Sequence, residues 1–219
     1  MLKLKALSMA LVLWALLGAM ALTAAASAES GFLGNANPVS FTISSGVTTI
    51  TTVGSSIIVK CTEDKGEGQN TKEDTLGWFA IKLKGCTAGG LPATGLSCGL
   101  VPTTCASKEI FVEGAYHLCV PWAEPLKAYQ VLLPNEVHFE VLGILTAVRG
   151  SVIGEVTSPS GTKEKISVFF KATSGRNELE ECEGVKRILE AETNGGAFEQ
   201  GGLETLETIT GPATEEIMY

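Results

Sequence analysis

Aspartate is nearly missing from this chain. Of its 24 acidic residues, only Asp64 and Asp74 are aspartate, and the others are glutamate. A calcium-binding loop of the D-x-D-x-D-G type needs several aspartates within about a dozen residues. The sequence therefore excludes that class of calcium site, together with most catalytic arrangements built on aspartate.

Histidine and basic residues are also scarce. The chain has only His117 and His138, and it carries 16 Lys and Arg against 24 Asp and Glu. The formal net charge of −8 repels a phosphate backbone, which argues against nucleic acid as a partner. We also find no cofactor-binding motif, so we expect no cofactor.

Long apolar runs occur at two places, and the first has the features of a signal peptide. Lys3 and Lys5 precede an apolar run from Ala6 to Leu22, and Ala26-Ser27-Ala28 fits a small-residue cleavage site. We expect residues 1–28 to form a signal helix that is removed before Glu29. The alternative is an uncleaved anchor, since apolar and small residues continue to Ala28.

The second apolar run extends from Val137 to Ile153. It contains His138, Glu140 and Arg149, which are too costly to place in a lipid-exposed span. We therefore expect no stable membrane span after cleavage. We expect residues 29–219 to form one domain of ordinary to large size that is secreted or associated with the cell envelope.

The six cysteines all follow the leader, and an even number in an exported chain favours disulfides. They are Cys61, Cys86, Cys98, Cys105, Cys119 and Cys182. Six cysteines allow 15 pairings, and the sequence does not choose among them. Proximity along the chain suggests Cys86 with Cys98 and Cys105 with Cys119, which leaves Cys61 with Cys182.

From Val39 onward the chain consists of short β-prone runs separated by Gly, Pro, Ser and Asn. Leu76 to Leu83 alternates clearly, and similar runs include "VTTITTV", "KEIFVEG", "AYQVLL", "EVHFEV" and "KISVFF". One segment is ambiguous, because "RNELEECEGVKRILEAE" suits either a short amphipathic helix or a strand. The pattern predicts an all-β domain, an antiparallel sandwich or a barrel.

Gly95-Leu96-Ser97-Cys98-Gly99 matches the G-x-S-x-G pattern of a hydrolase nucleophile elbow. An elbow needs a strand before the serine and a helix after it, and neither "GGLPATG" nor "LVPTTC" predicts these elements. No aspartate follows Ser97 in the chain. We therefore interpret this stretch as tight turns beside a disulfide, and we assign no catalytic residue.

The histidines raise the possibility of a metal site. His117-x-Cys119 and His138-x-Glu140 each place two potential ligands on one face of a strand, and together they would give four zinc donors. Three prolines separate the two pairs, so nothing brings them together. We favour a strand histidine beside a solvated glutamate, and we assign no metal ligand.

Two further features leave open whether the protein binds or hydrolyses an extracellular ligand. Aromatic residues could form a stacking platform, although strand aromatics are more often core residues; they are Trp78, Phe79, Tyr116, Trp122 and Tyr129. A pair of glutamates could support glycoside hydrolysis, but their spacing is set in space and not in sequence.

Several blocks of the chain look familiar: "VKCTEDKGEG", "KLKGCTAGGLPATGLSC", "GAYHL", "LLPNEVHFEV", "VRGSVIGEV" and "NGGAFEQGGLETLETIT". They resemble a large group of uncharacterised exported proteins from soil actinobacteria of the Thermoleophilia type. The most specific block runs from Arg149 to Ile153. The resemblance implies no activity and no functional residues.

We thus expect a disulfide-braced, non-enzymatic binding or structural protein of the cell envelope or exterior, with an unidentified extracellular or envelope ligand. The alternative is a secreted hydrolase that acts on glycans or esters.

Overall fold

A computed structural model describes residues 31–33, 38–53, 57–71, 76–99, 103–120, 127–157, 161–162, 165–211 and 216–218. The predicted signal peptide, its cleavage site and Trp122 lie outside these residues. Every regular element in the described part is a strand, which confirms the all-β prediction. Its strands before the loop at residue 96 are β1 (Gly31–Leu33), β2 (Ser40–Ser45), β3 (Thr48–Thr52), β4 (Ile58–Cys61), β5 (Glu63–Asn70), β6 (Leu76–Lys84), β7 (Thr87–Ala88) and β8 (Leu91–Gly95).

The strands after that loop include the two longest strands of the described part. They are β9 (Glu109–Cys119), β10 (Ala128–Pro134), β11 (Val137–Val141), β12 (Ile144–Gly150), β13 (Val152–Thr157), β14 (Gly161–Thr162) and β15 (Lys165–Phe170). Next come β16 (Ala172–Thr173), β17 (Arg176–Asn177), β18 (Glu181–Cys182), β19 (Val185–Lys186), β20 (Leu189–Thr193), β21 (Glu199–Thr210) and β22 (Glu216–Met218). The ambiguous segment therefore forms short strands, with a turn at Glu183 and Gly184, whose φ angles are positive.

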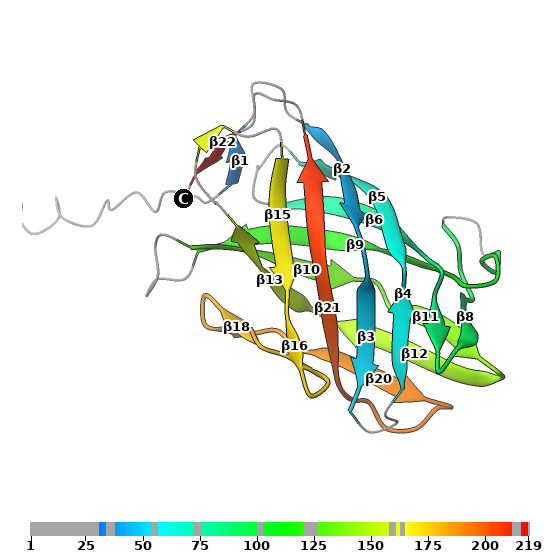
Figure 1. Cartoon of the computed structure of the whole chain (residues 1–219). Helices are drawn as coiled ribbons and strands as arrows, with labels where there is room; N and C mark the ends of the chain where they lie inside the picture. The colour runs from blue at the N-terminus through cyan, green and yellow to red at the C-terminus, as the bar shows by residue number, and fades with distance from the viewer. Residues whose placement is uncertain are drawn as a thin grey trace, which may run out of the picture.

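The fold is a barrel, which settles the choice between barrel and sandwich. Eight strands follow one another as β15-β13-β10-β9-β6-β5-β2-β21, and β21 pairs with β15 to close the ring. All these pairings are antiparallel. In Figure 1, β21 (red) runs between β15 (yellow) and the blue strands β2 and β3.

The barrel is extended by a second ring that shares β21. Its strands are β21-β20-β12-β11-β8-β7-β4-β3, and the pairing of β3 with β21 closes it. The first half of β21 pairs with β20 and β3, and its second half pairs with β15 and β2. Most strands of the first ring are next in the chain to a strand of the second ring, as β2 is to β3 and β10 is to β11. The two rings therefore form one long barrel.

The interior of the barrel is filled largely by apolar side chains from alternate positions of the strands, as period-two patterning requires. Phe41 and Tyr116 pack edge to face with ring centroids 5.5 Å apart. Tyr116 lies over Gly77 on the next strand, where a Cβ would collide with its ring. The glycine in "LGWF" thus makes room for a large core residue.

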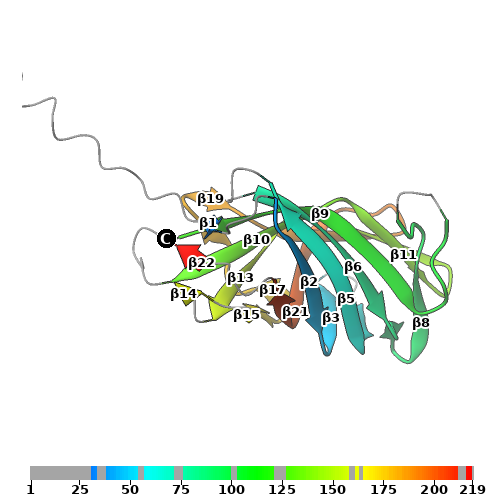
Figure 2. The same cartoon turned by 90° about the horizontal axis from the view of Figure 1, so that it is seen from above.

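A second, smaller cluster lies on the outside of the barrel. Tyr129, Val131 and Ile153 are buried there with the disulfide between Cys119 and Cys182. This disulfide joins β9 to the short hairpin of β18 and β19. Figure 2 shows that hairpin (orange) at the same end of the molecule as β1 and β22. β22 pairs with β1 on one side and with β14 on the other.

All six cysteines form disulfides, but each pairing that proximity suggested is wrong. The bonds are Cys61–Cys86, Cys98–Cys105 and Cys119–Cys182. Strand pairing in the barrel determines which cysteines meet. Cys61 ends β4 and Cys86 directly precedes β7, and these two strands pair with each other. Three internal disulfides indicate an oxidising, extracellular or envelope environment. Within the described residues we find no helix long and apolar enough to cross a membrane.

Candidate functional site

Two carboxyl groups point into the barrel from strands on either side of β2. Ser45 pairs with Asp64 of β5 on one side and with Glu207 of β21 on the other, so the three residues form one row across the sheet. Adjacent strands lie about 4.8 Å apart, which places the two carboxylates' Cα atoms roughly 10 Å apart. Only 1% of Asp64 and 3% of Glu207 is exposed.

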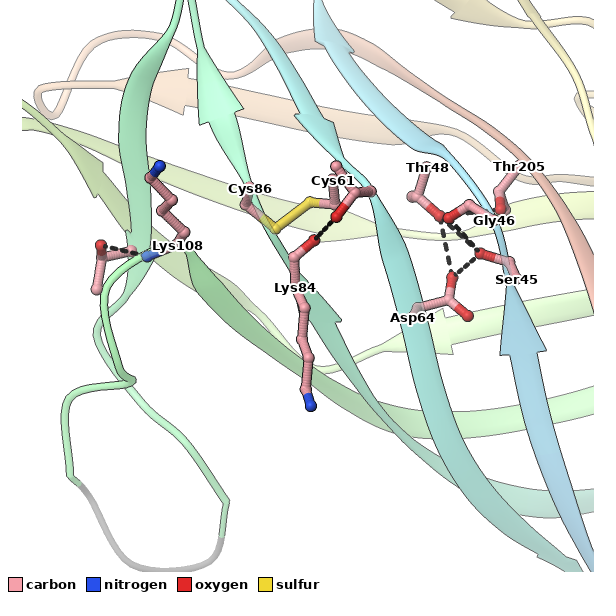
Figure 3. The surroundings of a disulfide bond; sticks show 11 residues. Ser45, Gly46, Thr48, Cys61, Asp64, Lys84, Cys86, Lys108 and Thr205 are labelled. Atoms are coloured by element: carbon pink, nitrogen blue, oxygen red, sulfur yellow. Dashed lines mark hydrogen bonds between the residues drawn. A yellow bond between two sulfur atoms is a disulfide. The ribbon is translucent and has the colours of Figure 1, made fainter.

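Asp64 is held by hydroxyl donors from β2 and β3. The Ser45 and Thr48 hydroxyls both donate to its Oδ2 atom, the latter at 2.9 Å. Because Thr48 uses its only proton in this way, it accepts the hydrogen bond from Thr205, whose Oγ1 lies 2.9 Å away. Figure 3 shows this chain of hydroxyls leading from β21 to Asp64, close to the Cys61–Cys86 disulfide.

One oxygen atom of each carboxyl group has no hydrogen-bond donor in the described part of the chain. Among the described residues, neither Oδ1 of Asp64 nor Oε2 of Glu207 has a hydrogen-bond partner. A buried polar atom without a partner typically costs 1–3 kcal/mol. Such an atom in a native fold needs an explanation, and one is that it meets a ligand.

These two carboxyl groups line a cavity of about 70 Å³ inside the barrel. Its wall is almost wholly apolar and includes Phe79, Phe139 and Val148, while Thr48 and Thr205 add hydroxyls beside the carboxyl groups. An apolar cavity with a few convergent polar groups is the usual form of a small-molecule site. Eight-stranded barrels have room for one small ligand at most.

Burial changes the acidity of both groups. It raises the pKa of Glu207 to about 8, with a further contribution from the negative charge of Asp64. Burial also raises the pKa of Asp64, while the hydroxyls of Ser45 and Thr48 oppose that rise and the charge of Glu63 adds to it. Glu207 is therefore mostly protonated at neutral pH, and the two hydroxyl donors favour the charged form at Asp64 over that at Glu207.

Sequence reasoning missed this site, although the sequence contains a signal for it. In "LETLETIT" the residues at alternate positions are Leu203, Thr205, Glu207 and Ile209, and this face points into the barrel. Leu206 points outward and is 52% exposed. The alternation thus placed one glutamate of this strand on the apolar face.

Ser97 lies in an exposed loop after β8, which the disulfide Cys98–Cys105 closes. The prediction that no strand precedes the serine was wrong, because β8 ends at Gly95. The described residues after Cys98 form a loop and then β9, without a helix. Within the described part, no hydrogen bond connects Ser97 to a histidine; the His138 ring instead lies 3.0 Å from Glu136.

The candidate metal ligands are not brought together. Cys119 is bonded to Cys182, so it offers no thiolate to His117. Glu140 accepts a hydrogen bond from the backbone of Gly143. No group of three potential metal ligands occurs among the described residues.

The proposed aromatic platform divides into core and surface residues. Phe79, Tyr116 and Tyr129 are buried, whereas Trp78 is 43% exposed on the outer face of β6. Trp78 borders an open groove over β5, β6 and β9, where Glu67 and Glu113 lie on either side of Ala80. This groove is a second concave surface, separate from the cavity in the barrel.

In the comparisons with known proteins, no family model, no curated protein and no solved structure matches this chain.

Proposed function

We propose that this protein is an exported, non-enzymatic binding protein that holds a small molecule inside its barrel. The observation that carries this proposal is the apolar cavity into which the buried Glu207 presents an oxygen without a partner. A purely structural interior would gain stability from an apolar residue at this position, because an unpartnered polar group is expensive to bury.

The architecture supports a role in binding. Because the ring is closed, each of its strands pairs with a neighbour on both sides. Three disulfides also brace the barrel at separate places. Such a rigid frame holds the carboxyl groups in position before a ligand arrives, which lowers the cost of binding. The disulfides are also consistent with the proposed export.

The proposal is tested by filling the cavity. Val148→Leu and Val152→Leu each add a methylene at the wall, whereas Val47→Leu adds one at an exposed position as a control. Ligand-observed NMR with a panel of three- to five-atom alcohols, amines and amides measures binding. We expect binding to the wild type and to the control, and at least a tenfold loss in the filled variants. Equal binding by all four proteins, or none by the wild type, would contradict the proposal.

A secreted glycan hydrolase is the alternative, and the outer groove is the observation that favours it. Glu67 and Glu113 are two strand spacings apart, roughly 10 Å between Cα atoms, with Trp78 beside them as a stacking surface. An assay of oligosaccharide release, with Glu113→Gln as the inactive variant, separates this function from binding inside the barrel.

A further inference from the structure

The cavity contains two acidic groups for which its wall supplies no positive partner. Of the residues that line it, only Asp64 and Glu207 titrate, and none is lysine, arginine or histidine. The ion pairs among the described residues lie on the surface and involve neither carboxyl group. A buried carboxylate without a cation is unfavourable, so a ligand that brings a cation offsets part of that cost.

We infer that the cavity binds a small primary alkylammonium ion, whose nitrogen lies between Asp64 and Glu207 and whose alkyl group lies against the apolar wall. This inference rests on the proposed function and deepens it, because it names the class of ligand.

The hydrogen-bonding groups match this class. An ammonium group has three donors and no acceptor. The cavity offers it Oδ1 of Asp64 and Oε2 of Glu207, both without partners, and the hydroxyl oxygen of Thr205, which still has a lone pair to accept with. One ammonium ion would therefore satisfy both unpartnered oxygens.

The charge also fits a monovalent cation. Burial raises the pKa of Glu207 to about 8, so at pH 7 this group is mostly neutral and the pair carries at most one negative charge. A divalent metal ion would require several more oxygen ligands, and the remainder of the wall is almost entirely apolar. An alkyl chain, in contrast, is stabilised by contact with that wall.

The size of the cavity limits the ligand to a few heavy atoms. Its volume of about 70 Å³ is roughly half that of a cavity known to hold benzene, about 150 Å³. Ethylammonium, with three heavy atoms, suits this space. A ligand of that size binds with a dissociation constant on the order of 1 mM at best.

Ethylammonium chloride, ethanol with potassium chloride, and potassium chloride alone form a matched set for thermal unfolding and NMR titration at pH 7. We expect ethylammonium to raise Tm by a few degrees at 20 mM, and to bind at least tenfold more tightly than ethanol. We expect Asp64→Asn to remove this preference, and Glu204→Gln, on the outer face of β21, to retain it.

The pH dependence gives a second readout. Glu207 loses its proton above pH 8, while an alkylammonium ion retains its own to about pH 10. Ethylammonium should therefore bind more tightly at pH 9 than at pH 7. Glu207→Gln should abolish this increase, because glutamine has no proton to lose.

The possible outcomes separate this inference from the proposed function. If ethanol binds as tightly as ethylammonium, the cavity binds ligands but the cationic class is wrong. If potassium chloride alone gives the same effect, the site is for a bare cation and the inference is overturned. If no compound binds, both proposals fail.

Discussion

Asp64 and Glu207 face the same cavity from β5 and β21, with only β2 between their strands. They are separated by more than 140 residues in sequence, and the closure of the barrel brings them together. Asp64 accepts hydrogen bonds from two hydroxyl groups, whereas Oε2 of Glu207 has no partner among the described residues. Donors to a carboxylate favour its charged form, so this asymmetry favours the charge on Asp64.

Stability should decrease as pH rises, because of Glu207. Its pKa is 4.5 in the unfolded chain and about 8 in the fold, so its contribution is fully present below pH 4.5 and is lost as pH rises through 8. Over that window the change is at most on the order of 5 kcal/mol. We expect urea unfolding of the wild type to show this loss, and Glu207→Gln to be more stable than the wild type at pH 9. Parallel pH profiles for the two proteins would refute the assignment.

The three disulfides should differ in their contribution to stability. Cys119 and Cys182 are 63 residues apart and Cys98 and Cys105 only 7, and a longer closed loop restricts the unfolded chain more. Replacing the first pair by alanine should cost about 2 kcal/mol more than replacing the second.

The control for this comparison is Ser97→Ala, beside the short loop. Ser97 is exposed and should change the free energy of unfolding by less than about 0.5 kcal/mol. A cost for Ser97→Ala equal to that of the Cys98–Cys105 replacement, or a loss of hydrolysis on Ser97→Ala, would overturn our interpretation of this stretch.

Gly77 should tolerate no side chain. A Cβ there would collide with the ring of Tyr116, whose hydroxyl donates to the buried Asn70. Gly77→Ala should therefore destabilise the fold by roughly 2 kcal/mol or more in urea unfolding. Gly46→Ala is the matched control, since no atom lies within 4 Å of a Cβ at that position. Similar losses for the two variants would show that the collision with the ring does not cause the effect.

Non-reducing peptide mapping of the exported protein tests the covalent framework. We expect cross-linked peptides that contain Cys61 with Cys86, Cys98 with Cys105 and Cys119 with Cys182. The same experiment should find Glu29 at the N-terminus, as the leader predicts. A free thiol or a different pairing would require another arrangement of the strands, and an intact leader would indicate an anchored protein.

The strands could be predicted from the sequence because their signal is local. Leu76 to Leu83 alternates between apolar and other residues, and these residues lie within β6 with Phe79, Ile81 and Leu83 buried. The all-β class follows from many such runs.

Closure of the barrel could not be predicted, because it depends on pairings between distant segments. Residues of β21 pair with β2, some 165 positions earlier in the chain, and no local pattern encodes that contact. The disulfides follow from the same long-range order, since Cys119 meets Cys182 only after β18 and β19 fold over β9 and β10. Proximity along the chain was therefore the wrong guide.

The candidate site was hidden for a related reason. Glu207 is one of several glutamates in β21, and the acidic composition of this strand alone suggests a solvated face. Only the assignment of an inward face to Leu203, Thr205 and Ile209 reveals it as buried. The partner, Asp64, is one of two aspartates in the whole chain, yet its scarcity gave no indication of its place in the fold.

Binding of a cation inside the barrel is tested most directly by an intermolecular NMR experiment on methyl-labelled protein with ethylammonium. We expect nuclear Overhauser effects between the ethyl protons and the methyl groups of Val148 and Val152, which line the cavity. We also expect their loss in Asp64→Asn. Contacts to the indole of Trp78 in the outer groove, without any to these valines, would contradict the account.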